Sequence, residues 1–368
     1  MRVVVLGGLG NFGARICRSL SEDESHEIIA AGRHATQSAG TITVNCASVR
    51  TAQLDIQADD FPDKLAKLQP ELVIHCAGPF QGQDYRVAES ACAVGAHYVD
   101  LSDGRRFVAN FAQCLDARAR AAEICAMSGA SSVPALSSAV TDMLAARYSR
   151  VDSISMAIAP GQQAPRGTAT LKAVFSYAGS PIGRLKDGVW QAAHGWQDLR
   201  VLRFPGLGTR WAAACDVPDL ELFPLRYPSA RTVEFHAALE LRIQHMALWL
   251  AAAMRRRGMR IPLERSAPWL NRVSIGLLDR FGSEDGGMLV KVTGIRLDGT
   301  AGASEWHLCA PDRSGPEIPC MAAILVARKI LAGELTARGA FACTGFLNLS
   351  EFGPLFHRWG IRTAIEES

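Results

Sequence analysis

The sequence lacks the motifs that define several large enzyme and membrane-protein classes. None of its ten cysteines forms a C-x-x-C pair, and no Cys/His set has the spacing of a zinc site, so we expect no metal. The motifs G-x-S-x-G, H-E-x-x-H and G-x-x-x-x-G-K are missing, which leaves hydrolases poorly supported. The longest late apolar run, Met246 to Met254, is far shorter than the roughly 20 residues of a membrane span. We therefore expect neither a metalloprotein nor a membrane-spanning helix.

The composition is that of an ordinary globular protein with no strong charge. The chain has 368 residues, of which 48% are hydrophobic and 20% charged, enough for about two domains. Its net charge of +3 gives no field that would attract nucleic acid. Cysteines such as Cys76 and Cys92 stand in apolar runs, as buried free thiols do in a reducing compartment. The first apolar run is too short for a signal peptide, so we expect a cytoplasmic protein. Because the net charge is small, we expect no nucleic-acid partner.

The first thirteen residues form the pattern around which the rest is organised. A β-branched apolar run, 2–6, ends in a glycine-rich turn, and an amphipathic stretch follows at once. Within the turn, two overlapping patterns occur, G-x-G-x-x-G and G-x-x-G-x-x-G. Such glycines allow a tight turn, close approach of a pyrophosphate, and close packing of the helix on the strand. The pattern predicts dinucleotide binding, and the alternative is a glycine-rich turn without a ligand. The residues concerned are Gly7, Gly8, Gly10, Asn11, Phe12 and Gly13.

The end of the second predicted strand, 27–31, indicates which dinucleotide is bound. An acidic residue here would bond the adenosine ribose hydroxyl and favour NAD, whereas arginine would pair with the 2′-phosphate of NADP. Arg33 stands at this place with no acid beside it, so we expect NADP in preference to NAD. The alternative is a surface arginine. A third strand, 51–55, ends in Asp55, which either meets the adenine amino group or caps the next turn.

The remaining first half continues the alternation of strands and helices. The continuous apolar strand 72–76 contains His75, interpreted as a core histidine, and runs into the loop Ala77, Gly78, Pro79 and Phe80. Ligands bind at the carboxyl ends of such strands. The order of elements predicts an α/β protein with a Rossmann doubly wound parallel sheet over residues 1–135.

The second half has a different texture, with polar–apolar alternation and many turns. We expect an α+β domain over 136–318, followed by a C-terminal segment, 319–368. Strand or mixed character is expected for 168–177, although a helix there is a close alternative. A hairpin is expected over 287–298 and 303–310.

Several motifs together resemble the saccharopine dehydrogenase-like family, and more closely the NADP-binding domain of saccharopine reductases. They are the glycine turn, the loop Ala77–Phe80, the run CAVGAHYVD over 92–100, and Ser131-Ser132-Val133-Pro134. The resemblance implies a Rossmann variant, an inserted substrate or dimerisation domain over 136–318, and a C-terminal segment, 319–368, that returns to the Rossmann domain. The reaction it implies reduces an imine or oxidises the corresponding amine. It also implies that the glycine turn holds the pyrophosphate, that Arg33 lies at the adenosine end, and that 77–80 lines the ribose and nicotinamide. Because members of this family commonly form homodimers, the resemblance also implies a homodimer.

Candidates for chemistry come from the predicted strand that begins at Tyr98 and from the acidic loop into which it runs. Tyr98, Asp100 and Asp103 are the candidates to handle the proton, although capping of the following segment is the favoured alternative for Asp100. A substrate carboxylate would suit an arginine, and three lie beside Gly or Pro turns: Arg166, Arg210 and Arg231. For each of these, a surface arginine is the alternative.

Two functions remain open, and a third is disfavoured. The first is an NADP-dependent oxidoreductase acting on C–N bonds of a small molecule. The second is a non-catalytic NADP-binding sensor or scaffold on the same fold. A short-chain reductase or epimerase would need Tyr-x-x-x-Lys, and none of the five tyrosines has lysine four residues later.

Overall fold

The computed structural model describes residues 1–34, 41–44 and 47–368. The chain divides into two units, each built from two segments. The first unit comprises Met1–Ala135 and Glu317–Leu347. The second comprises Leu136–Pro316 and Asn348–Ser368. Among the described residues, no helix is both long and apolar enough to cross a membrane.

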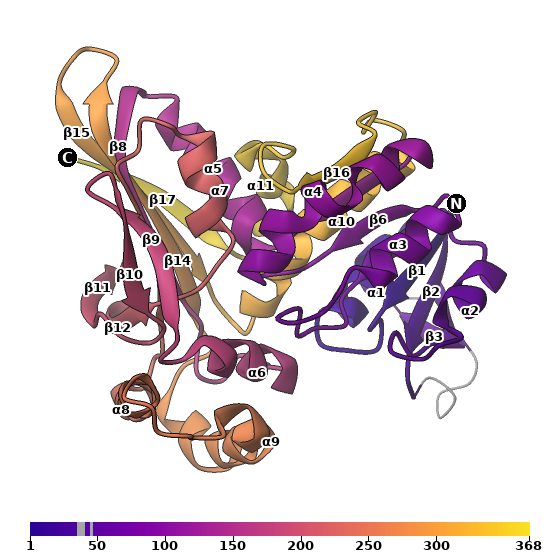
Figure 1. The fold of residues 1–368 in the computed structure, drawn as a ribbon, viewed down its shortest axis with the longest axis horizontal. Helices are drawn as coiled ribbons and strands as arrows, with labels where there is room; N and C mark the ends of the chain where they lie inside the picture. The colour runs from indigo at the N-terminus through magenta and orange to yellow at the C-terminus, as the bar shows by residue number, and fades with distance from the viewer. Residues whose placement is uncertain (35–40, 45–46) are drawn as a thin grey trace. The chain divides into compact units, whose positions relative to one another are not determined.

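The first unit contains an eight-stranded sheet in the order β16-β7-β6-β5-β1-β2-β4-β3 (Figure 1). Every neighbouring pair is parallel except β3 and β4, so the predicted doubly wound sheet is confirmed. Its strands are β1 (Arg2–Leu6), β2 (Glu27–Gly32), β3 (Thr41–Val44), β4 (Ala47–Gln53), β5 (Leu72–His75), β6 (His97–Asp100), β7 (Cys125–Ser128) and β16 (Gly339–Ala342). The third strand was expected over 51–55; it begins earlier, at Ala47, because it pairs with both β2 and β3.

Helices cover both faces of this sheet, which explains the continuous apolar runs of its central strands. They are α1 (Gly13–Leu20), α2 (Phe61–Lys67), α3 (Arg86–Ala93), α4 (Arg105–Ala121) and α10 (Ile318–Leu331). Side chains of α2, α3 and α4 share one core with Val4, Val73 and Tyr98. Helices α1 and α10 pack against each other and against β1, β2 and β6. The carboxyl ends of β1 and β5 are therefore held in place from both sides.

The second unit is a mixed sheet with helices on it. Its main strand order is β10-β9-β13-β8-β14-β15-β17, and β12 joins β11 to β13. The strands are β8 (Tyr148–Ala159), β9 (Pro181–Lys186), β10 (Val189–His194), β11 (Arg200–Phe204), β12 (Gly208–Ala214), β13 (Thr232–Ala238), β14 (Gly286–Arg296), β15 (Ala301–Ala310) and β17 (Arg362–Glu367). Strands β8 and β13 are parallel, and β14 with β15 forms the expected hairpin.

The helices of the second unit include one that the sequence interpretation placed wrongly. They are α5 (Ser137–Ala145), α6 (Thr168–Tyr177), α7 (Asp219–Arg226), α8 (Arg242–Arg256), α9 (Leu263–Val273), the short turns η3 (Ser274–Leu278) and η4 (Asp279–Phe281), and α11 (Leu349–Arg358). The expected strand or mixed segment over 168–177 is helix α6, which packs against α9. This tertiary contact overrides the β-branched and aromatic residues of the segment.

The expected return of all of 319–368 to the Rossmann domain is wrong for its last part. Residues 317–347 lie in the first unit, where β16 extends the parallel sheet beside β7. Residues 348–368 lie in the second unit. There β17 pairs antiparallel with β15, and Trp306 lies opposite Ile365. The last strand therefore completes the second sheet.

Candidate functional site

The glycine turn of the first unit is shaped by contacts that leave no room for side chains. Gly7 has a positive φ of 76°, which only glycine adopts without strain. A Cβ on Gly8 would lie 2.7 Å from Cα of Ala30 on β2. A Cβ on Gly13 would overlap the Gly7 carbonyl, so helix α1 begins directly against the turn. Gly7 and Gly13 therefore make the tight turn and the close helix packing that the motif predicts.

The start of α1 presents backbone donors that nothing in the described protein uses. The Gly10 N–H donates to Gly7 O at 2.8 Å, and the Ala14 N–H donates to Gly10 O at 3.0 Å. The N–H groups of Phe12 and Gly13 have no acceptor within the described part of the chain. Such free donors, together with the positive end of the helix dipole, form a site for the phosphates of a nucleotide.

The turn lies where the strand order of the sheet reverses. From β1 the chain goes to β2 on one side, and β5 pairs with β1 on the other. A Cβ on Gly7 would be 3.1 Å from the Ala77 nitrogen, so the loop after β5 lies directly beside the turn. Gln83 holds this loop by donating to Ala77 O at 2.9 Å and to Pro79 O at 2.7 Å. Dinucleotides bind at such switch points in doubly wound sheets.

The residues of the loop after β5 differ in how exposed they are to solvent. Ala77, Gly78 and Pro79 are partly exposed and could line a nucleotide. Phe80 is only 5% exposed, because its ring packs against His75 and Phe107 at centroid distances of 4.9 and 5.5 Å. Of Phe80, only the backbone can therefore face a cofactor.

Arg33 follows directly after β2 and is exposed. Its backbone oxygen accepts a hydrogen bond from Gln53 Nε2 at 3.1 Å, while its guanidinium has no carboxylate partner among the described residues. The cation is thus free to pair with an anionic group. Asp55 is partly buried, and its Oδ1 accepts from the Gln57 N–H at 3.0 Å, which is the turn-capping alternative for this residue.

A buried polar network joins the ends of β5, β6 and β7. The Tyr98 hydroxyl lies 3.1 Å from His75 Nδ1. Asp100 Oδ1 accepts from the N–H of Ser102 at 2.9 Å, the N–H of Gly129 at 2.8 Å and Oγ of Ser128 at 3.0 Å. Burial raises the pKa of Asp100 to about 6, although these donors oppose the shift. Burial also lowers the pKa of His75 to about 4 and raises that of Tyr98 well above its usual value.

This burial separates the three expected proton-handling residues. Tyr98 and Asp100 are fully buried, so neither side chain reaches a surface of the unit where a substrate could contact it. Asp103 is partly exposed in the loop before α4, and its Oδ1 accepts from Gln81 Nε2 at 3.1 Å. Partial burial raises its pKa above the usual range for aspartate. Of the three, Asp103 is therefore the carboxyl group that a ligand can reach.

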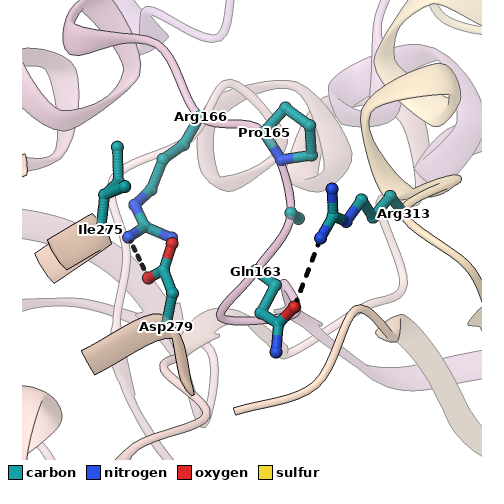
Figure 2. A pocket seen from close by; sticks show the side chains of 7 residues that line it. Gln163, Pro165, Arg166, Ile275, Asp279 and Arg313 are labelled. Atoms are coloured by element: carbon teal, nitrogen blue, oxygen red, sulfur yellow. Dashed lines mark hydrogen bonds and ion pairs between the residues drawn. The ribbon is translucent and has the colours of Figure 1, made fainter. Parts of the chain in front are cut away.

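In the second unit, Arg166 lines a cavity of about 310 Å³ (Figure 2). Its guanidinium donates to Asp279 Oδ1 at 2.7 Å and to Ser274 Oγ at 2.7 Å. Arg313 lines the same cavity, 3.4 Å from Gln163 Oε1, and pairs with Glu284 at 2.7 Å. Figure 2 shows Arg166 and Asp279 facing one another. The cavity thus has two arginines, each partly neutralised by an acid.

The other two candidate arginines do not belong to this cavity. Arg210 is only 4% exposed, and it donates to the carbonyl oxygens of Ala159 and Pro160 at 3.2 and 2.9 Å. Its ion pair with Glu240 spans 3.6 Å, and burial lowers its pKa. Arg231 is exposed at the start of β13, where its N–H donates to Asp152 O. Because β13 and β8 are parallel, Arg231 lies at the opposite end of the sheet from Arg166. The three do not form one site.

Several residues of these sites carried no pattern that the sequence analysis could use. Asp279 and Arg313 are ordinary polar residues whose partners Arg166 and Glu284 come from other segments, and Gln83 is an ordinary polar residue that holds the loop just before it. Only folding brings them together. Among the described residues, no group of His, Cys, Asp and Glu side chains is arranged to hold a metal ion.

Comparisons with known proteins find a match for most of the first segment of the first unit. Residues 3–127 match the family model of the saccharopine dehydrogenase NADP binding domain. This confirms the resemblance and the NADP cofactor expected from the sequence. No curated protein sequence matches the chain.

Solved structures share the fold over nearly the whole chain. Saccharopine dehydrogenase (L-Glu forming) from Saccharomyces cerevisiae has 13% identity and a TM-score of 0.65, with 100% of this chain and 99% of that chain covered. Homospermidine synthase from Legionella pneumophila, solved with NAD, has 10% identity and a TM-score of 0.61, with 100% and 91% covered. The DAP dehydrogenase of C. glutamicum, solved with DAP, has 16% identity and a TM-score of 0.52, with 96% and 98% covered. At these identities the likeness establishes a two-domain dehydrogenase fold.

Proposed function

We propose that this protein, whose residues 3–127 are a saccharopine dehydrogenase NADP binding domain, is an NADP-dependent oxidoreductase acting on a C–N bond. The observation that carries the proposal is the glycine turn at the switch point, with the free N–H groups of Phe12 and Gly13 beside the loop 77–80. A catalytically silent NADP sensor on the same fold is the alternative. Similar solved structures include saccharopine dehydrogenase, DAP dehydrogenase and homospermidine synthase, which supports a C–N substrate.

The protein's contribution to nucleotide binding can be assigned residue by residue. The N–H groups at the start of α1 would hold the pyrophosphate, and the Arg33 guanidinium would pair with the 2′-phosphate. The backbone of 77–80, held by Gln83, would line the ribose and nicotinamide side. Asp55 could reach the adenine with the part of its carboxylate that does not cap the turn.

When bound, NADPH supplies the hydride, so the protein needs to orient the substrate and to hold or deliver a proton. Asp103 is the carboxyl group placed for this role, because it is reachable and its raised pKa favours proton exchange nearer to neutral pH. Tyr98 and Asp100 are positioning residues in this scheme, since their hydrogen bonds fix the loops that follow β6 and β7.

Within the second unit, the cavity around Arg166 is the place where a small anionic molecule can bind. The Arg166 guanidinium donates through Nε to Asn271, through Nη1 to the Gln162 carbonyl, and through Nη2 to Ser274 and Asp279. Its second Nη1 hydrogen is left to donate a charge-assisted hydrogen bond to a carboxylate. Asp279 holds this guanidinium in place, and its negative charge opposes the binding of an anion. Arg313, which lines the same cavity, provides a second positive charge that attracts the anion. A small molecule with one carboxylate fits this cavity.

NADPH oxidation tests the proposal, with a panel of amines mixed with keto acids or aldehydes as substrate. Turnover should fall about 100-fold or more in Asp103→Asn, the usual range for loss of a general acid, while NADPH affinity stays the same. Arg166→Gln should raise KM about tenfold or more, and Arg231→Gln, at the other end of the sheet, should leave KM unchanged. NADPH binding without any turnover would establish the sensor alternative instead.

A further inference from the structure

One part of the second unit exposes apolar side chains and arginines together. Helices α8 and α9 and the turns η3 and η4 form this part, residues 242–281. Helices α8 and α9 lie side by side in Figure 1, and an ion pair between Arg255 and Glu264 joins them at 3.3 Å. We call its exposed side chains the basic apolar patch. The exposed large apolar members are Ile243, Leu250, Met254, Met259, Trp269, Ile275, Leu277 and Phe281.

The apolar residues of α8 follow a helical repeat on the outer face. Ile243, Leu250 and Met254 are spaced seven and four residues apart, and exposed Ala247 fills the gap. They therefore form one stripe along the helix. The inner face carries buried His245 and other buried side chains that pack against the unit, so α8 is apolar on both sides. The outer stripe has no partner within the described residues of the chain.

The charge of this part is strongly one-sided. Residues 242–281 contain eight arginines, one glutamate and one aspartate. This excess of six positive charges is twice the net charge of the whole chain, which is +3, so the rest is net acidic. Seven of the arginines are exposed and have no ion pair with any described carboxylate; they are Arg242, Arg256, Arg257, Arg260, Arg265, Arg272 and Arg280.

We propose that the basic apolar patch binds the surface of an anionic lipid bilayer, without crossing it. Exposed Trp269 and Phe281 beside arginines match the composition of helices that lie in a membrane interface. The apolar stripe would enter the boundary between headgroups and acyl chains. The arginines would meet the lipid phosphates, for which a planar guanidinium is well suited.

The charges and side chains disfavour the other occupants of such a surface. In a symmetric dimer the same patch meets itself, which would bring unpaired arginines such as Arg256 and Arg260 of both copies together. Nucleic acid would satisfy the arginines but would leave Ile243, Leu250 and Met254 in contact with phosphate or water. Of these three occupants, the anionic lipid surface is the one that offers partners to both kinds of side chain.

Vesicle flotation with the full chain tests this proposal. Vesicles of 30% phosphatidylglycerol in phosphatidylcholine should bind the protein, and pure phosphatidylcholine vesicles should bind it at least tenfold more weakly. Each arginine near the surface is worth about a fivefold change in binding, so Arg256→Gln with Arg260→Gln should weaken binding about 25-fold. The double variant Leu250→Glu with Met254→Glu should weaken it at least tenfold.

The control is a double variant with the same change of charge elsewhere in the second unit. Leu225 and Leu297 are 77% and 72% exposed, so Leu225→Glu with Leu297→Glu should fold and should bind vesicles like the wild type. Absence of binding, or equal binding to both vesicle types, would overturn the proposal. A wild-type dimer in solution that Leu250→Glu converts to a monomer would also overturn it, because the patch would then be a subunit interface.

Discussion

The buried carboxyl group of Asp100 should make the stability of the first unit depend on pH in a specific direction. Its pKa is raised from 3.8 to about 6, chiefly by burial. A raised folded-state pKa means that the native state holds this proton more tightly than the unfolded chain does. The contribution of Asp100 to stability is therefore highest at low pH and falls as pH rises from about 4 to about 6.

The size of the effect follows from the shift. Two pKa units correspond to about 3 kcal/mol, the cost of keeping Asp100 ionised in the native state at neutral pH. At pH 4.5 the same linkage gives a cost of about 1 kcal/mol. Asp100→Asn removes the titration but keeps an acceptor oxygen for the donors Ser102, Ser128 and Gly129. The free energy of unfolding of the variant, relative to that of the wild type, should therefore rise by about 2 kcal/mol between pH 4.5 and pH 7.5.

Urea unfolding followed by circular dichroism at both pH values measures this difference. Tryptophan fluorescence serves as an internal control, because all seven tryptophans lie in the second unit. Subtracting the free energy of unfolding of the wild type from that of the variant cancels the contributions of the other titrating groups. A stability difference between the two proteins that is the same at pH 4.5 and pH 7.5 would refute the reasoning. Asp100→Ala, which leaves three buried donors without an acceptor, should destabilise the protein at both pH values.

Two further outcomes follow from the same structure. Gly8→Ala should destabilise the first unit by about 1–3 kcal/mol in urea unfolding, since its Cβ would collide with Ala30, whereas Gly32→Ala, with nothing within 4 Å of its Cβ, should be neutral. In the second unit, burial raises the pKa of Asp219 to about 7, so its stabilising contribution should fall as pH rises from about 4 to 7. Asp219→Asn should remove about 4 kcal/mol of that pH dependence, measured by tryptophan fluorescence; an unchanged slope would show that Asp219 is not the group responsible.

The sequence was sufficient for the parts of the fold that depend on local patterns. The glycine turn, the parallel sheet and the hairpin of β14 and β15 each follow from periodicity and turn residues over a few positions. The segment 168–177 was misassigned, because its packing against α9 outweighs its intrinsic preference. The last strand was missed for the same reason, since β17 is specified by β15, more than 50 residues earlier.

The candidate site likewise contains residues that a local pattern predicts and residues that depend on distant contacts. Arg33 and the glycine turn could be found from sequence because a strand end fixes where they point. The burial of Asp100 could not, since its donors Ser128 and Gly129 come from β7 and the residue that follows it. The cavity around Arg166 depends on Asp279 and Arg313, which lie more than 100 residues away in the chain. Pairings of that length leave no pattern in a single sequence.

The most direct test of the central claim is a calorimetric titration of the protein with NADPH and with NADH, repeated on Arg33→Ala. We expect micromolar binding of NADPH, weakened about 10- to 100-fold in the variant, because a charged pair with the 2′-phosphate is lost. NADH affinity should be weaker and unaffected by the substitution. If neither nucleotide binds, or if Arg33→Ala weakens both equally, the NADP-dependent oxidoreductase account is contradicted.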